Sequence, residues 1–342
     1  MVRVSIIILN YNGRGYLEKF LPVLFKSVSK DLAKIIVADN ASTDGSVEYL
    51  TESWPDAEIF QFQKNYGFAE GYNIAIKRAT TEYVLLLNSD VEVTPGFLEP
   101  LVKYMESNPK VAACQPKIMQ LSDRSRFEKA GAAGGLIDAL GYPFCRGRIM
   151  DYTEVDSGQY DNEAFVFWAS GACMLVRRKD FIDYGGFDSE FFAHQEEIDL
   201  CFRFNARGRK VGAVPSSVVY HLGGGTLNYN NPQKTYYNFR NNLLMLYKNL
   251  KPKHLVPIAI MRFFLDYLAA LVFLFKGDFA NANAVRRARW DFIKMKSRFR
   301  AKRRANLEVS IAKSIPSAYR GSIVFEYYIL HRRNVKRKQK LN

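Results

Sequence analysis

Three short polar sequences each follow a run of apolar residues: Asn10-Tyr11-Asn12, Asp39-Asn40 and Asn88-Ser89-Asp90. The runs before them lack polar alternation, which predicts strands covered on both faces of a sheet. Because the carboxyl ends of parallel strands meet at one edge, we expect these polar side chains to converge on a ligand-binding crevice. Turns closed by Asn and Asp side chains are the alternative for each sequence taken alone.

The converging groups suit a nucleotide and its phosphates. Two oxygen-bearing side chains at positions i and i+2, such as Asn88 and Asp90, can hold a divalent cation that in turn holds a diphosphate. Asp39 is placed to accept a hydrogen bond from a base N–H, and Asn10 or Tyr11 to flank the ring.

A glycine-containing segment, residues 65–73, follows a short predicted strand at 58–63. We expect Asn65, Gly67 and Asn73 to shape the pocket for the same ligand. The alternative for Asn65 is a helix N-cap, in which its side chain would bond a backbone N–H.

The elements that must position these groups alternate between strand and helix. Helical spacing of apolar residues predicts helices at 16–29, 71–79 and 96–108, and a further strand is expected at 111–114. The alternation is typical of an α/β fold with a mostly parallel sheet flanked by helices. Residues 120–163 are rich in glycine and are expected to form a long irregular loop.

The C-terminal part has a different character. Residues 255–275 are apolar and long enough to span a bilayer at about 1.5 Å per residue. Arg262 and Asp266 interrupt them four residues apart, where they can pair with each other. Because charges are costly inside lipid, we expect a helix, or two short helices broken near Pro257, that lies in the membrane interface.

The charge distribution supports this interpretation. The formal net charge of the 342 residues is +15, and Lys and Arg crowd residues 286–340. Each basic residue near an anionic leaflet contributes roughly 1 kcal/mol to binding. A solvated basic helix without a partner is the alternative. The four cysteines form no C-x-x-C pair, and the apolar run 4–9 is too short for a signal sequence, so we expect a reduced, cytosolic compartment without export.

Taken together, the motifs resemble those of the family 2 glycosyltransferases. The resemblance covers about residues 3–250 and is carried by 5–12, 37–46 and Asn65-x-Gly67-Phe68-Ala69-x-Gly71-x-Asn73. Among these enzymes the chain is most similar to the bacterial rhamnosyltransferase-like and galactofuranosyltransferase-like members. The resemblance implies a GT-A fold, a nucleotide-sugar donor, a divalent metal (Mg²⁺ or Mn²⁺) and inversion at the anomeric carbon.

The family's functional positions fall on particular residues here. Its nucleotide-binding aspartate falls on Asp39, and its D-x-D metal motif on Asn88-Ser89-Asp90. Asn88 departs from the motif as a neutral amide, which leaves Asp90 as the chief expected ligand. The acidic pair near the acceptor falls on Glu196-Glu197, with Glu197 as the expected general base. A histidine followed by glycines falls on His221 and implies a further metal contact; a structural histidine is the alternative.

A sugar transfer with inversion needs a carboxylate that takes the proton of the attacking hydroxyl. Burial, together with the neighbours Glu196 and Asp199, can raise the pKa of Glu197 towards neutrality for this task. On a helix Glu196 and Asp199 share a face and Glu197 points elsewhere. A solvated acidic face is the alternative. We also expect Asp199 and Trp168 at the acceptor site, although Trp168 suits a hydrophobic core as well.

The sequence therefore predicts a catalytic domain at 1–250 and a helical, basic, membrane-associating region at 251–342. The expected reaction moves a sugar from a dTDP- or UDP-linked donor to a lipid-linked glycan during cell-surface polysaccharide synthesis. We expect the enzyme at the cytoplasmic side of the inner membrane, peripheral or monotopic, bound to an anionic surface and not to nucleic acid. A nucleotidyltransferase using the same cleft and a basic nucleic-acid-binding protein are the alternatives.

Overall fold

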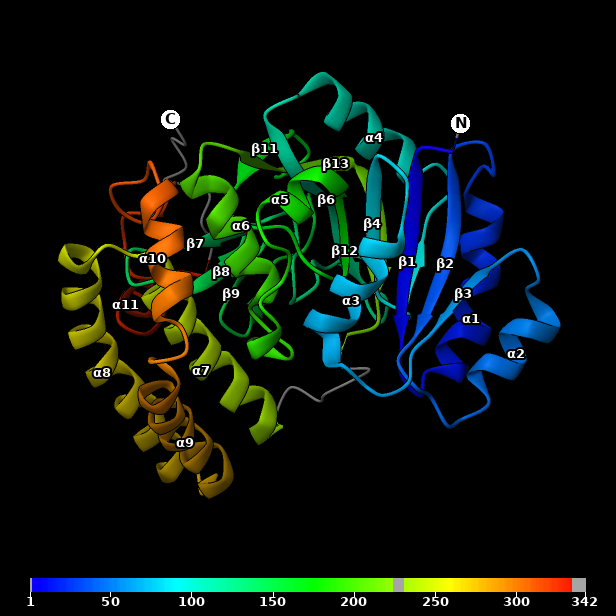
Figure 1. Ribbon diagram of the computed structural model, residues 1–342. Coiled ribbons are helices and arrows are strands. Elements are labelled where there is room, and N and C mark those ends of the chain that lie inside the picture. Colours follow the sequence, from blue (N-terminus) through cyan, green and yellow to red (C-terminus); the bar gives the residue numbers. More distant parts are fainter. Residues whose placement is uncertain (1, 224–230, 334–342) are drawn as a thin grey trace.

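The computed structural model of the protein describes residues 2–223 and 231–333 (Figure 1). Its central sheet contains β1 (Val4–Asn10), β2 (Ala33–Asp39), β3 (Glu58–Gln61), β4 (Tyr83–Leu87), β5 (Val91–Val93), β6 (Val111–Gln120), β11 (Ala164–Val166), β12 (Cys173–Arg177) and β13 (Lys210–His221). The order across the sheet is β11-β13-β6-β12-β4-β1-β2-β3, and β5 pairs with β13.

Helices cover both faces of this sheet. They are α1 (Arg14–Ser27), α2 (Ser46–Ser53), α3 (Gly67–Arg78), α4 (Leu98–Ser107), α5 (Arg178–Asp183), α6 (Glu196–Ala206) and α7 (Pro232–Asn249), with a 3-10 turn at Ser189–Phe191. Alternate residues of one strand belong to different cores: Leu86 packs with residues of α3 and α6, and Leu85 with residues of α1 and α4. Burial on both faces explains why the strand sequences show no polar alternation.

The parallel strands bring the polar sequences to one edge, as predicted. β1 pairs in parallel with both β2 and β4, and Asn10 stands opposite Asp39 in the register. In Figure 1 the arrowheads of β1 and β2 point down, so this edge lies at the bottom of the view. The α/β fold class is confirmed, with one addition: β12 is inserted antiparallel between β4 and β6.

The expectation of an irregular loop at 120–163 is wrong. This segment contains a second, antiparallel sheet made of β7 (Gly135–Ile137), β8 (Pro143–Cys145), β9 (Arg148–Ile149) and β10 (Tyr152–Thr153). Its strands are only two or three residues long, too short for periodicity to reveal. Leu136, Phe144 and Ile149 pack against Ile323 of α11 (Ile323–Tyr328) in a small core of their own.

The C-terminal region is helical, as expected, and contains α8 (Pro252–Phe275), α9 (Phe279–Met295), α10 (Arg300–Val309) and α11. α8 and α9 lie side by side at the end of the molecule farthest from β3 (Figure 1). α8 runs unbroken through Pro257, so the alternative of two short helices is wrong. Later segments return to the sheet domain: Lys302 of α10 forms an ion pair with Asp188, and Ile323 donates its N–H to Asp138.

Candidate active site

Asn10 and Asp39 form a buried pair at the ends of β1 and β2. The Asn10 amide donates to Oδ1 of Asp39 (3.1 Å) and to the Ser42 hydroxyl (3.1 Å), and the Ser42 N–H donates to Oδ2 of Asp39 (2.9 Å). Neither side chain has solvent-accessible surface. In this arrangement the pair joins the loops after β1 and β2, and the expected contacts of Asp39 and Asn10 with a base stay predictions.

Tyr11 and Asn12 are the accessible members of this edge. Tyr11 is 50% exposed, and Asn12 adopts a positive φ of 50° while its Oδ1 accepts the N–H of Thr43. Gly13 then passes close to the neighbouring loop, since a Cβ atom there would lie 2.5 Å from Oδ1 of Asn10 and 3.6 Å from the Ser89 hydroxyl. The loops after β1 and β4 are therefore in contact, as a shared ligand site requires.

The segment 65–73 is held by its own polar side chains. Oδ1 of Asn65 accepts N–H bonds from Gly67 and from the Asn40 amide, although the N-cap residue of α3 is Tyr66 and not Asn65. α3 begins at Gly67, earlier than expected. Asn73 is mostly buried, and its side chain forms two hydrogen bonds with the backbone of Phe187. Asn73 therefore links α3 to the loop that contains Phe187.

Asp90 meets His221 across the sheet. Oδ1 of Asp90 lies 3.1 Å from Nε2 of His221, and Oε1 of Glu128 lies 3.6 Å from Nδ1 of the same ring. All three side chains are buried. Burial lowers the pKa of His221, but the two carboxylates outweigh burial and raise it to about 10. Gly224 and Gly225, which follow His221 in the glycine run, lie outside the described residues.

These residues fit a divalent cation only in part. Among residues 2–223 and 231–333, no three His, Cys, Asp or Glu side chains form a ready metal-binding group. Asp90 and His221 would supply two ligands, and Glu128 behind the imidazole matches the carboxylate that orients a ligating histidine. Mg²⁺ bound beside phosphates takes few protein ligands and completes its shell with phosphate oxygens and water. The donor set therefore fits a metal that arrives with a diphosphate.

Glu196 and Glu197 begin α6 and differ in exposure. Glu196 is buried with Asp199, whereas Glu197 is partly exposed, as the helical spacing predicted. The Oε2 atoms of both glutamates are inaccessible and have no hydrogen-bond partner in the described part of the chain. Burial raises the pKa of Glu197 to about 7 and that of Glu196 well above its usual value. A carboxyl poised near pH 7 suits a general base.

A strained turn presents this pair. Phe192, His194 and Gln195 have φ values of 66°, 68° and 73°, and the Ala193 N–H bonds the Phe191 carbonyl across a γ-turn centred on Phe192. Such conformations cost of order 1–3 kcal/mol each and cluster at functional sites. The Phe192 carbonyl accepts N–H bonds from Phe68 and Ala69, which ties the turn to the start of α3.

Two residues of α7 hold this turn and were missed as site residues. The Asn241 amide donates to the carbonyls of Phe191, Ala193 and His194, and the Arg240 guanidinium to those of Glu190 and Phe191. In the sequence both residues look like ordinary polar positions, and only their burial reveals the role.

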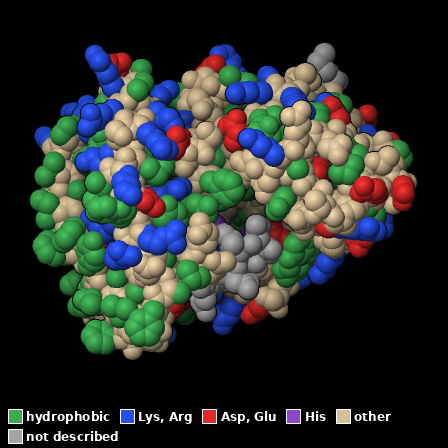
Figure 2. Space-filling view, turned by 60° about the horizontal axis from the view of Figure 1, so that its bottom comes forward, with side chains coloured by type: hydrophobic (Ala, Val, Ile, Leu, Met, Phe, Trp, Pro, Cys, Tyr) green, Lys and Arg blue, Asp and Glu red, His purple; other side chains and the backbone are tan. Residues whose placement is uncertain are grey.

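The acidic pair and the Asn88–Asp90 turn share one edge. A Cβ atom at Gly171 would lie 4.0 Å from Cβ of Glu197, and the next residue, Ala172, accepts the N–H of Asn88 (3.0 Å). The N–H of Leu222 bonds the carbonyl of Asp90, so the end of β13 joins them. Figure 2 brings this edge forward and shows a hollow in that face of the molecule.

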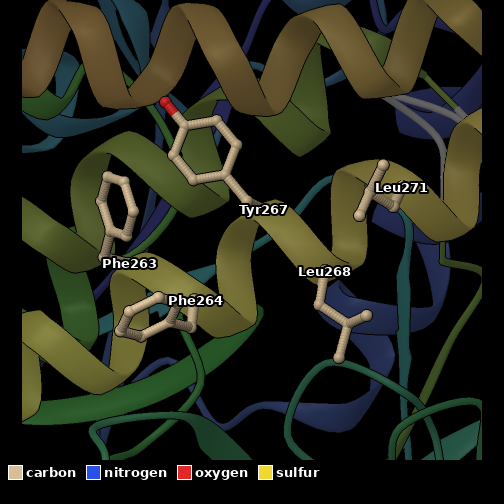
Figure 3. Close-up of a pocket in the computed structure, with 5 residues that line it drawn as sticks. All are labelled: Phe263, Phe264, Tyr267, Leu268 and Leu271. Carbon is tan, nitrogen blue, oxygen red and sulfur yellow. The ribbon is translucent and has the colours of Figure 1, made fainter.

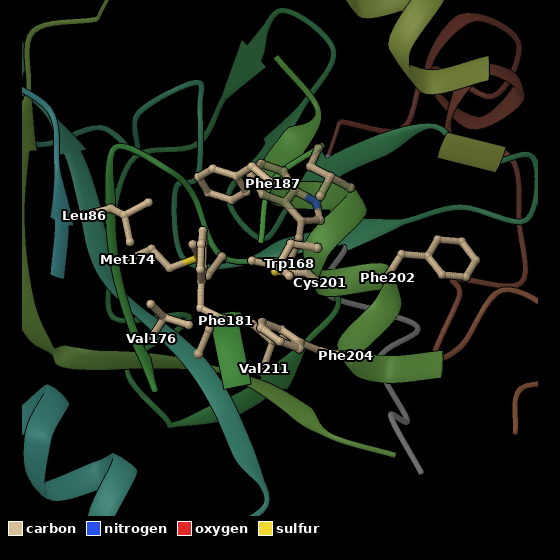
Figure 4. Close-up of a cluster of buried hydrophobic side chains, with 14 of the residues drawn as sticks. Leu86, Trp168, Met174, Val176, Phe181, Phe187, Cys201, Phe202, Phe204 and Val211 are labelled. Atoms are coloured by element: carbon tan, nitrogen blue, oxygen red, sulfur yellow. The ribbon is translucent and has the colours of Figure 1, made fainter. Parts of the chain in front are cut away.

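Two expected acceptor residues are structural. Asp199 is fully buried, and its carboxylate is bound by Lys248 (2.7 Å), Arg203 (3.0 Å) and Asn249 (2.8 Å). The prediction that Asp199 contacts an acceptor is therefore wrong. Trp168 is 5% exposed, and its indole N–H donates to the Leu136 carbonyl (2.9 Å). It lies among apolar side chains in Figure 4, so the core alternative holds and the stacking role is wrong.

With the geometry established, comparison with known proteins is informative. The model of glycosyl transferase family 2 matches residues 5–185. This chain belongs to that family. It is a glycosyltransferase, and the family selects this activity over the nucleotidyltransferase and nucleic-acid-binding alternatives.

Two curated relatives each match 64% of this glycosyltransferase. The N-acetylglucosaminyl-diphospho-decaprenol L-rhamnosyltransferase of Mycobacterium tuberculosis is 28% identical over 234 residues, 64% of this chain and 75% of that protein. The rhamnosyltransferase WbbL of Escherichia coli K12 is 26% identical over 225 residues, 64% of this chain and 83% of that protein. The resemblance to rhamnosyltransferase-like members is therefore confirmed.

A solved structure supports the fold. GalNAc-T7 in complex with UDP, GalNAc and Mn²⁺ superimposes with a TM-score of 0.57 at 15% identity, covering 74% of this glycosyltransferase and 49% of that chain. At this identity the likeness establishes the GT-A fold alone.

Proposed function

We propose that the protein transfers a sugar from a dTDP- or UDP-linked donor to a lipid-linked glycan, with inversion, in cell-surface polysaccharide synthesis. The observation that carries the proposal is the position of Glu197, a carboxyl with a pKa of about 7, at the same sheet edge as the Asn88-Ser89-Asp90 turn. The M. tuberculosis relative is named for a rhamnose transfer to an N-acetylglucosaminyl-diphospho-lipid, which supports the same class of acceptor here.

In the proposed reaction an acceptor hydroxyl oxygen attacks the anomeric carbon while the bond to the donor diphosphate breaks. Glu197 takes the hydroxyl proton, for which its raised pKa is suited. The loops that carry Tyr11, Asn12 and Ser89 would hold the nucleotide and its phosphates. Asp90 and His221 would hold a Mg²⁺ or Mn²⁺ ion, which when bound would supply positive charge for the departing diphosphate.

The surface of α8 supports the lipid-linked acceptor. By length and composition it is the one described helix able to cross a membrane. Phe263, Phe264, Tyr267, Leu268 and Leu271 line an apolar hollow on its outer side (Figure 3), and Phe264 and Leu268 are more than half exposed. In Figure 2 apolar side chains gather over α8, with Lys and Arg between them.

We infer that α8 lies in the interface of the cytoplasmic leaflet and does not cross it. Arg262 and Asp266 face the protein body and are buried there, so one side of the helix is already covered. The exposed apolar side and the exposed basic residues of α9, such as Arg286 and Lys294, together provide the two signals that stable anchoring needs.

One assay tests this function: release of nucleoside diphosphate from dTDP-rhamnose and a panel of UDP-sugars, with and without N-acetylglucosaminyl-diphospho-lipid in vesicles. We expect release that depends on both the lipid acceptor and a divalent metal. Turnover that ignores the acceptor, or none with any donor, would refute the proposal.

A further inference from the structure

A buried polar chain links α8 to the turn that presents Glu196 and Glu197. Arg262 pairs with Asp266 through Nε (3.1 Å) and donates through Nη1 to Oδ1 of Asn242 on α7. The Asn242 amide then donates to Oε1 of Gln195 (3.2 Å). Arg262, Asp266, Asn242 and Gln195 are all at least nine-tenths buried.

The orientation of the Asn242 amide depends on this contact. Because Arg262 has only donors, it fixes the oxygen of Asn242 towards α8, and the NH₂ group donates to Gln195 and to the Gly141 carbonyl (2.9 Å). The forked guanidinium reaches a carboxylate and an amide at once, which a lysine ammonium on one stem does less well. Its plane also lies over the Tyr142 ring, 3.9 Å from the centroid.

Gln195 is the residue through which such a contact can act. It is the N-cap of α6 in a left-handed conformation, and its carbonyl accepts the N–H of Asp199. Glu196 and Glu197 follow it directly, and their buried Oε2 atoms have no hydrogen-bond partner among the described residues. The direction in which the glutamates leave the turn therefore depends on how Gln195 is held, together with the contacts of Asn241 and Arg240 to the preceding carbonyls.

We propose that Arg262 is a positioning residue for the Glu196–Glu197 pair, acting through Asn242 and Gln195. The proposal rests on the proposed function, since it gives the pair its catalytic task. It assigns the two sides of α8 different work: the outer side meets lipid, and the inner side sets the geometry of the base. In this proposal α8 both binds the membrane and positions the Glu196–Glu197 pair that deprotonates the acceptor.

A matched control exists on the neighbouring helix. Arg289 of α9 also pairs with Asp266 (2.6 Å) but has no contact with Asn242. Arg289→Gln therefore weakens the attachment of α8 and leaves the chain to Gln195 intact. Asn242→Ala does the reverse, because it keeps the Arg262–Asp266 pair and breaks the chain in its middle. Asn242→Ala also tests the proposal if Arg262→Met fails to fold.

The first measurement is amide hydrogen exchange of the peptide spanning residues 190–197 in the full-length protein. We expect faster exchange in Arg262→Met and Asn242→Ala and wild-type exchange in Arg289→Gln. Equal acceleration in Arg289→Gln, or none in Asn242→Ala, would overturn the proposal. This measurement involves no sugar transfer, so it stands or falls apart from the proposed function.

The second measurement is kinetic. Arg262→Met and Asn242→Ala should lower kcat by about 10- to 100-fold, the size expected for a misplaced reacting group, with the KM for the nucleotide sugar within about twofold. The double variant should lose no more than the worse single variant, since both break one chain. Losses that multiply, or that appear in KM and not in kcat, would contradict a positioning role.

Discussion

Nε2 of His221 lies 3.1 Å from Oδ1 of Asp90, although 131 residues separate the two in the sequence. The antiparallel pairing of β13 with β5 creates this contact, because His221 stands opposite Val91 in the register. Glu128 approaches the other ring nitrogen from the segment between β6 and β7. Three distant parts of the chain thus build one half of the candidate site, and the acidic pair of α6 builds the other.

Glu128→Gln tests whether the imidazole is oriented for a metal. Loss of a carboxylate behind a ligating histidine typically weakens metal binding about 10- to 100-fold. We expect that loss when Mn²⁺ is titrated in the presence of UDP. Glu154→Gln is the control, since Glu154 is also buried but bonds Tyr160. Equal Mn²⁺ affinity in wild type and Glu128→Gln would exclude a metal contact of His221.

The pH dependence of kcat tests the base. Burial raises the pKa of Glu197 from 4.5 to about 7, and the base is the deprotonated form. The rate should therefore climb with pH up to about 7 and level off above it. Glu197→Gln should lower kcat by about 10²- to 10⁴-fold and lose this limb. If Glu197→Gln keeps both the wild-type kcat and the rise of kcat with pH below about 7, then another residue is the base.

Asp199→Asn separates a structural from an acceptor-binding role. The change leaves Lys248 and Arg203 facing a neutral amide in the interior, and breaking a buried ion pair costs about 3–5 kcal/mol. We expect a marked drop in the free energy of unfolding measured with urea, while the folded fraction keeps the wild-type KM for the acceptor. An unchanged unfolding curve with a raised acceptor KM would reverse the assignment.

Membrane binding is tested on the outer side of α8. Phe264→Ser with Leu268→Ser removes two side chains that are 64% and 55% exposed, so the fold should be unaffected. Burying each in lipid contributes about 1.5–3 kcal/mol, so flotation with anionic vesicles should weaken by more than about tenfold. Phe165→Ser, at a 49% exposed site on β11, is the control. Full binding by the α8 variant would refute the interfacial helix.

The sequence was most informative where a local residue pattern is typical of one kind of secondary structure. Unalternating runs such as 83–87 predicted buried strands, and the parallel sheet then brought Asn10, Asp39 and Asp90 to one edge. Helical spacing likewise predicted that Glu196 and Asp199 would share a face and Glu197 would point elsewhere, and the structure buries that shared face. These predictions rest on residue periodicity and on where parallel strands end, and they need no knowledge of long-range contacts.

Long-range contacts decided what the sequence left open. Asp199 is indistinguishable from a site carboxylate until Lys248, 49 residues away, neutralises it. Trp168 is buried because Gly135, in a strand too short to predict, leaves room for its ring. Glu128 and Asn241 carry no local pattern, since their roles depend on which distant backbone or ring they meet.

Buried polar contacts fasten α8 to the protein body, among them the hydrogen bond from Arg262, the partner of Asp266, to Asn242 of α7. A helix on a loose tether would let the catalytic edge sample many heights above a bilayer, whereas a fastened one holds it at a single height and tilt. Under the proposed function such an enzyme selects its acceptor by length. The sugar is transferred to the glycan hydroxyl that stands at that height, and not to those of shorter or longer chains.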